Sequence, residues 1–359
     1  MARLARLRIH QLRALAAVDI EPAEGLNLLV GANGAGKTSV LEAIFLLSHG
    51  RSFRAGGAEV LAAHGSDGFA IHADVKGSEG RPHRLGLGRE AGRWRVVVDG
   101  EARESRGALV GLCPAVCFEP GSHALIAAGS ERRRRFLDWG VFHVEQDFIA
   151  LWRRYQRALQ QRNALLRGRA QDSELAPWEH EMAAAAAPLD LLRAGYIEQW
   201  AAQLVKESAA LAPALGPASV SYQRGWPAPL ALDEALRESR DRDRARGHTT
   251  IGAHRADWRL AFEQAPAREH LSRGQEKLAV LACVLAQGEL YARLAAAWPI
   301  VCLDDLASEL DAERRAGLVA RLGQSGAQIW ITGTAVPAEL QDRAEQVFHV
   351  EQGRVQAAR

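Results

Sequence analysis

The residues with the clearest chemical potential form a glycine-rich loop. Gly31 to Thr38 reads GANGAGKT, which matches the phosphate-loop pattern GxxxxGKT at every fixed position. Closely spaced glycines let backbone N–H groups converge on a phosphate, Lys37 reaches the β- and γ-phosphates, and Thr38 can hold Mg²⁺. The predicted nucleotide-binding residues are Gly31, Ala32, Asn33, Gly34, Ala35, Gly36, Lys37, Thr38 and Ser39.

The elements beside this loop occur in the order that the pattern requires. Leu26 to Val30 is a short apolar strand, and residues 38–48 place apolar side chains at helical spacing. This context disfavours the competing interpretation, a glycine-rich turn with an accidental lysine. A dinucleotide fold is weaker still, because the sequence has no GxGxxG.

A pair of carboxylates follows a second apolar strand far downstream. Ile300 to Leu303 ends in Asp304 and Asp305, which is the form of a Walker B element. We expect Asp304 to bind Mg²⁺ and Asp305 to orient or deprotonate the attacking water, so Lys37, Asp304 and Asp305 are the predicted catalytic residues. Taken alone, such a pair is as readily a helix N-cap.

The stretch that precedes this strand decides between the two interpretations. Leu271 to Gln275 reads LSRGQ, starts an apolar-periodic helix at 277–294, and resembles the signature motif of ABC-type ATPases. In that family the signature of one subunit completes the phosphate-loop site of another, which implies an ATP-dependent homodimer. The predicted signature residues are Ser272, Arg273, Gly274 and Gln275, and Asp311 ends a stretch that resembles the D-loop. The fold class is therefore α/β, an ABC-type ATPase head with a mixed sheet and flanking helices.

A long segment separates the two halves of this predicted site. It has no sustained heptad repeat, so we expect a compact, mostly helical arm in place of a long coiled coil. The predicted organisation is 1–130 for the first part of the head, 131–244 for the arm and 245–359 for the rest of the head. Helical patterns begin at residue 146 and cover 178–187 and 189–209, and a strand at 249–262 is expected to return to the head. Residues 237–246 mix five arginines with three acidic residues and are interpreted as an exposed connection.

Positive charge is concentrated in part of the arm. Residues 131–170 carry ten arginines and four acidic residues, whereas the net charge of the whole chain is +2. Arginine suits nucleic-acid phosphates, although a solvated helix face explains the charge equally well. The candidate DNA-binding residues are Arg133, Arg134, Arg153 and Arg157.

The composition is that of a soluble protein with a large core. The chain has 359 residues, of which 48% are hydrophobic and 25% charged. No uninterrupted apolar run approaches membrane-spanning length, and no secretion signal is evident, so a cytoplasmic protein without membrane contact is expected. The four cysteines form no CxxC pair, which disfavours zinc and disulfide frameworks.

The motifs together resemble the RecF family, which is related to SMC and Rad50 heads. The resemblance rests on residues 31–42, 50–54, 133–140, 161–164, 252–257, 271–275 and 303–315. It implies ATP and Mg²⁺ as cofactors, dimerisation on DNA with ATP bound, and slow, DNA-stimulated hydrolysis. It also implies action with RecO and RecR to load RecA at single-strand gaps, with RecR as a direct partner.

Two features of ABC transporters are absent from the sequence. Residues 115–120 contain no glutamine, and Thr332-Gly333-Thr334 stands where a histidine would follow the last core strand. Thr334 is therefore only a candidate γ-phosphate sensor. These departures and the helical insert argue against the main alternative, the cytosolic subunit of an ABC transporter. A nucleotide-gated scaffold that binds proteins is disfavoured by the arginine-rich segment, and the roles of His254 and Arg255 are left open.

Overall fold

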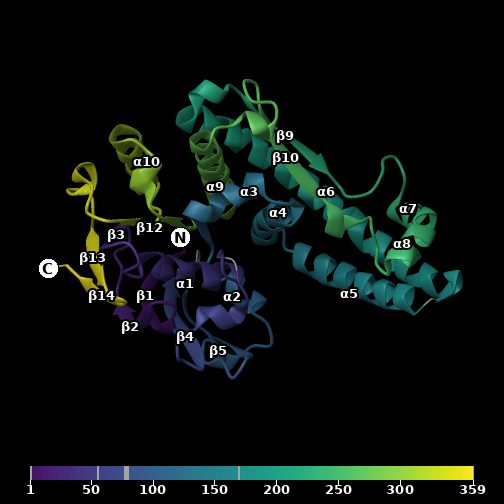
Figure 1. The fold of residues 1–359 in the computed structure, drawn as a ribbon, viewed down its shortest axis with the longest axis horizontal. Coiled ribbons are helices and arrows are strands. Elements are labelled where there is room, and N and C mark those ends of the chain that lie inside the picture. Colours follow the sequence, from purple (N-terminus) through teal and green to yellow (C-terminus); the bar gives the residue numbers. More distant parts are fainter. Residues whose placement is uncertain (1, 55, 77–80, 169, 359) are drawn as a thin grey trace. The chain divides into compact units, whose positions relative to one another are not determined.

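The chain folds into two compact units. The computed structural model describes residues 2–54, 56–76, 81–168 and 170–358. The head combines residues 1–123 with residues 273–359, and the arm is the continuous stretch 124–272 inserted between them (Figure 1). The predicted order of head, arm and head therefore matches this division, but both boundaries differ from the predicted positions at 130 and 244.

Two sheets form the framework of the head. The first is antiparallel, in the order β2-β1-β4-β5-β6-β7. Its strands are β1 (Arg3–Leu12), β2 (Leu15–Ile20), β4 (Gly68–Lys76), β5 (Pro82–Glu90), β6 (Arg93–Val98) and β7 (Glu101–Ala102). The second sheet has the order β14-β13-β3-β12-β11-β8, and only β14 runs antiparallel to its neighbour. Its strands are β3 (Leu26–Val30), β8 (Ala115–Phe118), β11 (Ile300–Leu303), β12 (Ile329–Gly333), β13 (Gln346–Glu351) and β14 (Arg354–Ala357).

Helix α1 (Lys37–His49) belongs to a hydrophobic core that both sheets share. Its apolar residues Val40, Leu41, Ile44 and Leu47 are fully buried, as the helical spacing predicts. The inner strands β3 and β11 are buried at every position, which explains why they read as continuous apolar runs. Further helices of the head are α2 (Gly107–Val110), α9 (Arg273–Ala295), which contacts β8, and α10 (Ala312–Gln324), which contacts β12. The predicted strands at 26–30 and 300–303 are confirmed.

Helix α9 is the one described helix that is long and apolar enough to cross a membrane. The sequence contains no uninterrupted apolar run of that length, but the mean hydropathy along this helix is high enough for a membrane span. Of its most apolar window, 67% is buried inside the structure. Its hydrophobicity is therefore explained by its place in the core of the head.

The arm is mainly helical, as predicted. Its helices are α3 (Ala124–Ala127), α4 (Ser130–Val144), α5 (Phe148–Arg167), α6 (Asp172–Leu211), α7 (Leu232–Glu238) and α8 (Arg240–Arg246). The long pair α5 and α6 pack along each other (Figure 1). The helical patterns predicted at 178–187 and 189–209 belong to one helix, because α6 passes through both Pro177 and Pro188. Buried Ala185, Ala186 and Leu189 around the second proline hold the helix in its packing site.

The predicted strand at 249–262 does not return to the head. Only its second half is a strand, β10 (Asp257–Phe262), which pairs antiparallel with β9 (Ala218–Gln223) inside the arm. Trp258 of β10 is buried against Phe136 and Trp200 of neighbouring helices. The arm therefore continues to residue 272, and the predicted boundary near 244 is corrected accordingly.

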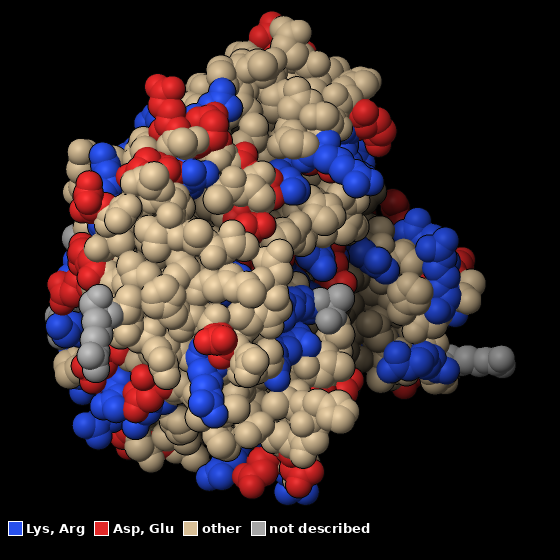
Figure 2. Space-filling view, turned by 60° about the vertical axis from the view of Figure 1, so that its left-hand side comes forward, with Lys and Arg blue, Asp and Glu red and all other residues tan. Residues whose placement is uncertain are grey.

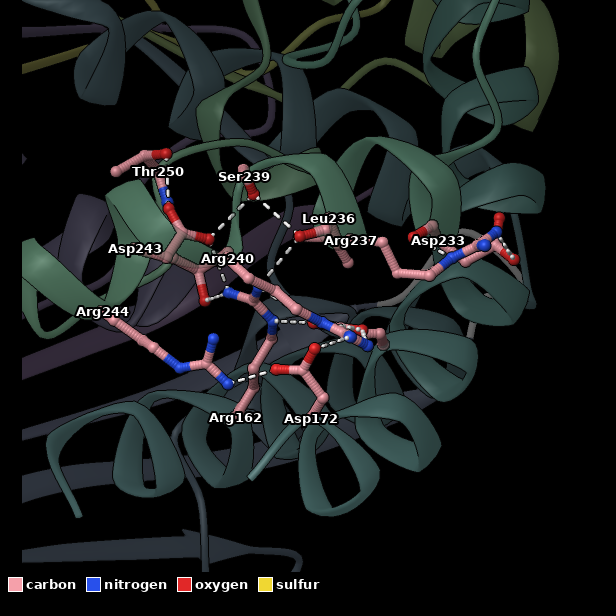
Figure 3. A network of polar contacts seen from close by, with 12 residues as sticks. Arg162, Asp172, Asp233, Leu236, Arg237, Ser239, Arg240, Asp243, Arg244 and Thr250 are labelled. Carbon is pink, nitrogen blue, oxygen red and sulfur yellow. Dashed lines mark hydrogen bonds and ion pairs between the residues drawn. The ribbon is translucent and has the colours of Figure 1, made fainter. Parts of the chain in front are cut away.

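The charged run at 237–246 is not an exposed connection. It forms the end of α7 and all of α8, and Asp243 is completely buried. Asp243 binds the buried guanidinium of Arg162 at 2.7 Å (Figure 3). Glu179 binds both Arg162 at 3.0 Å and Arg240 at 2.5 Å. This network holds α8 against α5 and α6, because a buried charge is stable only when it is paired and hydrogen-bonded.

Candidate functional site

The phosphate loop lies between β3 and α1, where the sequence predicts it. Gly36 has a positive φ of 115° and stands at the N-terminus of α1, and a Cβ there would lie 2.7 Å from Leu15. Gly34 also has a positive φ, of 81°, but a Cβ would meet nothing within 4 Å, so this side of the loop is open. The glycines thus allow both the turn and the approach of a ligand to the backbone.

Lys37 is folded back onto the loop itself. Its Nζ donates to the carbonyl oxygens of Gly31 at 2.7 Å and Ala32 at 2.8 Å. Burial lowers the pKa of this ammonium group, while the nearby carboxylates of Asp304 and Asp305 oppose that shift. The ammonium is therefore held at the mouth of the loop, where a triphosphate would accept from it.

Asp304 lies at the centre of a short chain of hydrogen bonds. Its Oδ1 accepts from Thr38 Oγ1 at 3.1 Å and from Thr332 Oγ1 at 2.6 Å. Burial raises the pKa of this carboxyl group, and the two hydroxyl donors counteract the rise. The paired Thr38 hydroxyl and Asp304 carboxylate are the oxygen ligands that Mg²⁺ takes in phosphate-loop ATPases, so the residues present fit this ion.

Asp305 differs from Asp304 in conformation and exposure. Its backbone is left-handed, with φ of 53°, its N–H donates to Thr332 Oγ1 at 2.9 Å, and its side chain is exposed. Thr332 therefore ties both aspartates to the end of β12. Thr334 is the predicted candidate at this end of the sheet, and Thr332, which the sequence did not single out, lines the same cavity.

The cavity beside these groups has a volume of about 480 Å³, within the range of small-molecule sites. It is lined by Arg13, Ala14, Asn33, Gly34, Gly36, Lys37, Thr38, Ser39, Arg54, Pro120, Asp304, Asp305, Thr332 and Thr334. Arg13 and Arg54 are not among the predicted site residues. Residues 50–54 stood out only as part of the family resemblance, and no local sequence pattern indicates a role for Arg13, which lies at the turn from β1 to β2.

The predicted signature and D-loop residues surround the start of α9 and α10. Arg273 and Gly274 are exposed at the N-terminus of α9, Ser272 is exposed just before it, and Gln275 is half-buried. Asp311 caps α10 by accepting from the Arg314 N–H at 2.9 Å. Lys277 of α9 binds Glu309, two residues before Asp311, at 2.6 Å. The signature residues that belong to the head are Arg273, Gly274 and Gln275. None of these three residues lines the 480 Å³ cavity.

The four candidate DNA-binding arginines fall into two groups. Arg133 binds Asp257 through two nitrogens, at 2.7 and 3.0 Å, and Arg134 donates to the carbonyl of Ala256 at 2.8 Å. Both arginines therefore have internal roles within the arm.

Arg153 and Arg157, by contrast, are exposed and make no hydrogen bond or ion pair with any residue that the structure describes. On the face shown in Figure 2, basic and acidic side chains are interspersed. On that face, the distribution of charge alone therefore does not indicate a DNA-binding surface.

The remaining residues with an open role have structural contacts. His254 Nε2 donates to the carbonyl of Thr249 at 3.2 Å, so Nδ1 accepts from Tyr155 Oη at 2.7 Å. Burial lowers the pKa of His254 to about 4, and the ring is neutral at physiological pH. Arg255 is exposed beside it.

A phosphate loop, a buried Walker B strand and a helical insert between them define an ATPase head of the SMC type. Comparison with known proteins agrees: the model for the RecF/RecN/SMC N terminal domain matches residues 3–357. The chain is 47% identical to the DNA replication and repair protein RecF of Stenotrophomonas maltophilia (strain R551-3), over 98% of both chains. It is 37% identical to the protein of the same name from Edwardsiella ictaluri (strain 93-146), over 98% of this chain and 99% of that one.

Solved structures give the same result. The recombination mediator protein RecF with ATP, of the RecFOR pathway, superimposes with a TM-score of 0.91 at 25% identity, over 100% of this chain and 98% of that one. The Smc head domain of Pyrococcus furiosus, at 14% identity and a TM-score of 0.59 over 100% of this chain and 96% of that one, shares the fold. The chain belongs to the RecF family, and the predicted fold class is confirmed.

Proposed function

We propose that this chain is an ATP-dependent DNA-binding protein of recombinational repair. ATP drives its dimerisation on DNA at single-strand gaps, and slow, DNA-stimulated hydrolysis releases the dimer. There it helps RecO and RecR to load RecA, with RecR as a direct partner. The observation that carries this proposal is a cavity that contains Lys37, Thr38 and Asp304 but none of the signature residues Arg273 to Gln275.

The chemistry follows from the groups in the cavity. Lys37 and the loop N–H groups bind the β- and γ-phosphates, and Thr38 and Asp304 would hold Mg²⁺, which would neutralise charge on the phosphates. Asp305 orients the attacking water. Because aspartate is shorter than the glutamate more often used for this task, we infer slow turnover. Thr332 keeps the two aspartates in a fixed relation through its hydroxyl group.

The homodimer supplies the signature that the cavity lacks. The exposed backbone N–H groups at the start of α9, together with the hydroxyl of Ser272, are suited to bind the γ-phosphate of ATP held by a second subunit. Asp311 and its neighbours lie at the same interface by analogy with the D-loop. An isologous dimer with two composite sites satisfies both requirements.

Mixing two inactive variants tests the composite site. We expect Lys37→Met and Ser272→Arg each to lack turnover, because each removes one half of both sites. In a one-to-one mixture half of the dimers are heterodimers, each with one intact site, so activity returns to about a quarter of the wild-type level. Turnover is measured at equal total protein, with light scattering to record the dimer. A mixture that stays inactive while the dimer forms contradicts the shared site.

DNA binding is assigned to the exposed face of α5. Arg153 and Arg157 stand one helical turn apart, on the side opposite the buried Phe148, Tyr155 and Leu159, and offer two exposed guanidinium groups to phosphates. Arg133 and Arg134 are proposed to support the arm from inside. The alternative of a transporter subunit is disfavoured, because the relatives matched along the whole chain are DNA replication and repair proteins.

Titration of gapped, duplex and single-stranded DNA with and without ATP tests the proposed function. We expect ATP to tighten binding and Arg153→Glu/Arg157→Glu to weaken it about tenfold or more, with a shallower dependence on salt. The matched control is Arg95→Glu/Arg103→Glu, which makes the same charge change at exposed positions of the head. If ATP changes neither the oligomeric state nor the DNA affinity of the wild type, the proposal is wrong, and a protein-binding scaffold becomes the better explanation.

A further inference from the structure

Glu42 is a buried carboxylate beside the ATP cavity. It lies in α1, on the helix that begins at Lys37, and its side chain is fully inaccessible to solvent. Its oxygens accept from Arg13 Nη2 at 2.8 Å and Nε at 3.1 Å and from Ser52 Oγ at 2.5 Å, and they form an ion pair with Arg54 Nη1 at 3.4 Å. Three chain segments that are separate in sequence therefore meet at one carboxylate.

Both arginines that Glu42 binds reach the cavity. Arg13 and Arg54 line it together with Lys37 and Thr38. Asp304 lines the same cavity. Arg54 therefore shares this cavity with Thr38 and Asp304, the proposed Mg²⁺ ligands.

The charges of Arg13 and Arg54 explain why an acidic residue is required between these two side chains. Two guanidinium groups at one wall of a cavity repel each other, and a shared carboxylate offsets this repulsion and fixes their geometry. The cluster keeps a net charge of +1, so it still attracts a triphosphate. Groups held in place before binding lose less entropy when the ligand arrives.

We propose that Glu42 is a positioning residue for ATP, which holds Arg13 and Arg54 so that they bind the triphosphate. The inference rests on the proposed ATP site. Glu42 itself does not touch the nucleotide; it acts through the two arginines. Arg54, which shares the cavity with Thr38 and Asp304, is the arginine that we expect to distinguish ATP from ADP.

The test is the Glu42→Gln variant, which keeps the shape of the side chain but removes its charge. We expect its affinity for a fluorescent ATP analogue to fall about tenfold, while its affinity for the matching ADP analogue changes less than about twofold. Glu42→Asp keeps the charge and should retain more of the ATP affinity. The control is Glu339→Gln, which breaks a comparable pair with Arg315 elsewhere in the head and should leave both affinities unchanged.

Three outcomes overturn the inference. One is an unchanged ATP affinity in Glu42→Gln, when the wild type binds ATP. Another is an equal loss for ATP and ADP accompanied by a lower melting temperature, which would indicate a merely structural role. The third is full additivity with Arg54→Ala, because a residue that acts through Arg54 has less to lose once Arg54 is gone.

Arg54→Ala provides the measurement if Glu42→Gln does not fold, since the Arg54 side chain is 36% exposed. It should show the same preferential loss of ATP over ADP, and an equal loss would overturn the inference. A wild-type chain that binds no ATP would overturn the proposed function as well, so the two failures are distinguishable.

Discussion

A Lys37→Met variant loses ATP turnover and binds ATP at least about tenfold more weakly than the wild type. Methionine is similar in length to lysine but offers no charge and no donor to the phosphates. Among the residues that the structure describes, Lys37 Nζ donates hydrogen bonds to the loop carbonyls of Gly31 and Ala32, so its loss removes few contacts that hold the fold together. The effect should therefore appear in nucleotide binding and turnover and leave the melting temperature almost unchanged.

Asp305→Asn is the matched comparison for that variant. Its side chain is exposed at the cavity and takes no part in holding Mg²⁺ in the proposed mechanism, so ATP binding should stay within about twofold of the wild type. Turnover should nevertheless be lost. Equilibrium binding and phosphate release, measured on both variants, separate the two roles; retained turnover in Asp305→Asn would remove Asp305 from the mechanism.

The largest effect on stability is expected in the arm, from Arg162→Met. This change leaves Glu179 and Asp243 without the guanidinium group that lies between them, and Asp243 is completely buried. Breaking such a buried pair costs about 3–5 kcal/mol. Most of the nine tryptophans lie in the arm, so unfolding in urea followed by tryptophan fluorescence reports its stability.

Arg154→Met on the same helix is the control. Its partner, Glu181, and Arg154 itself are both well exposed, and water screens their attraction. The expected loss is below about 1 kcal/mol. If both variants lose the same free energy of unfolding, the buried network does not stabilise the arm as proposed.

The sequence predicted the parts of the site that depend on local pattern. Gly31 to Thr38 needs a strand before it and a helix after it, and both are visible as apolar periodicity. The buried strand that precedes Asp304 is likewise visible in the sequence as a continuous apolar run. Arg13 and Arg54 could not be found in this way, because they reach the cavity only through the tertiary contact of two loops with Glu42 in α1.

The wrong predictions for the arm have the same cause, because they concern residues whose partners are distant in sequence. The charged residues at 237–246 have the composition of an exposed segment, and only the distant partners Arg162 and Glu179 show that Asp243 and Arg240 are structural. The strand ending at Phe262 was recognised, but nothing in its sequence indicates that it pairs with β9 and not with the head.

The interleaving of the mixed sheet has a consequence for synthesis of the protein. Strand β3 lies between β12 and β13, which are translated near the end of the chain, whereas the arm is continuous. On the ribosome we expect the arm to fold without waiting for the C-terminal strands, while β3 and its loop remain with unpaired edges. The ATP site is then completed only in a nearly full-length chain. A prematurely terminated product therefore cannot bind ATP and compete with the complete protein.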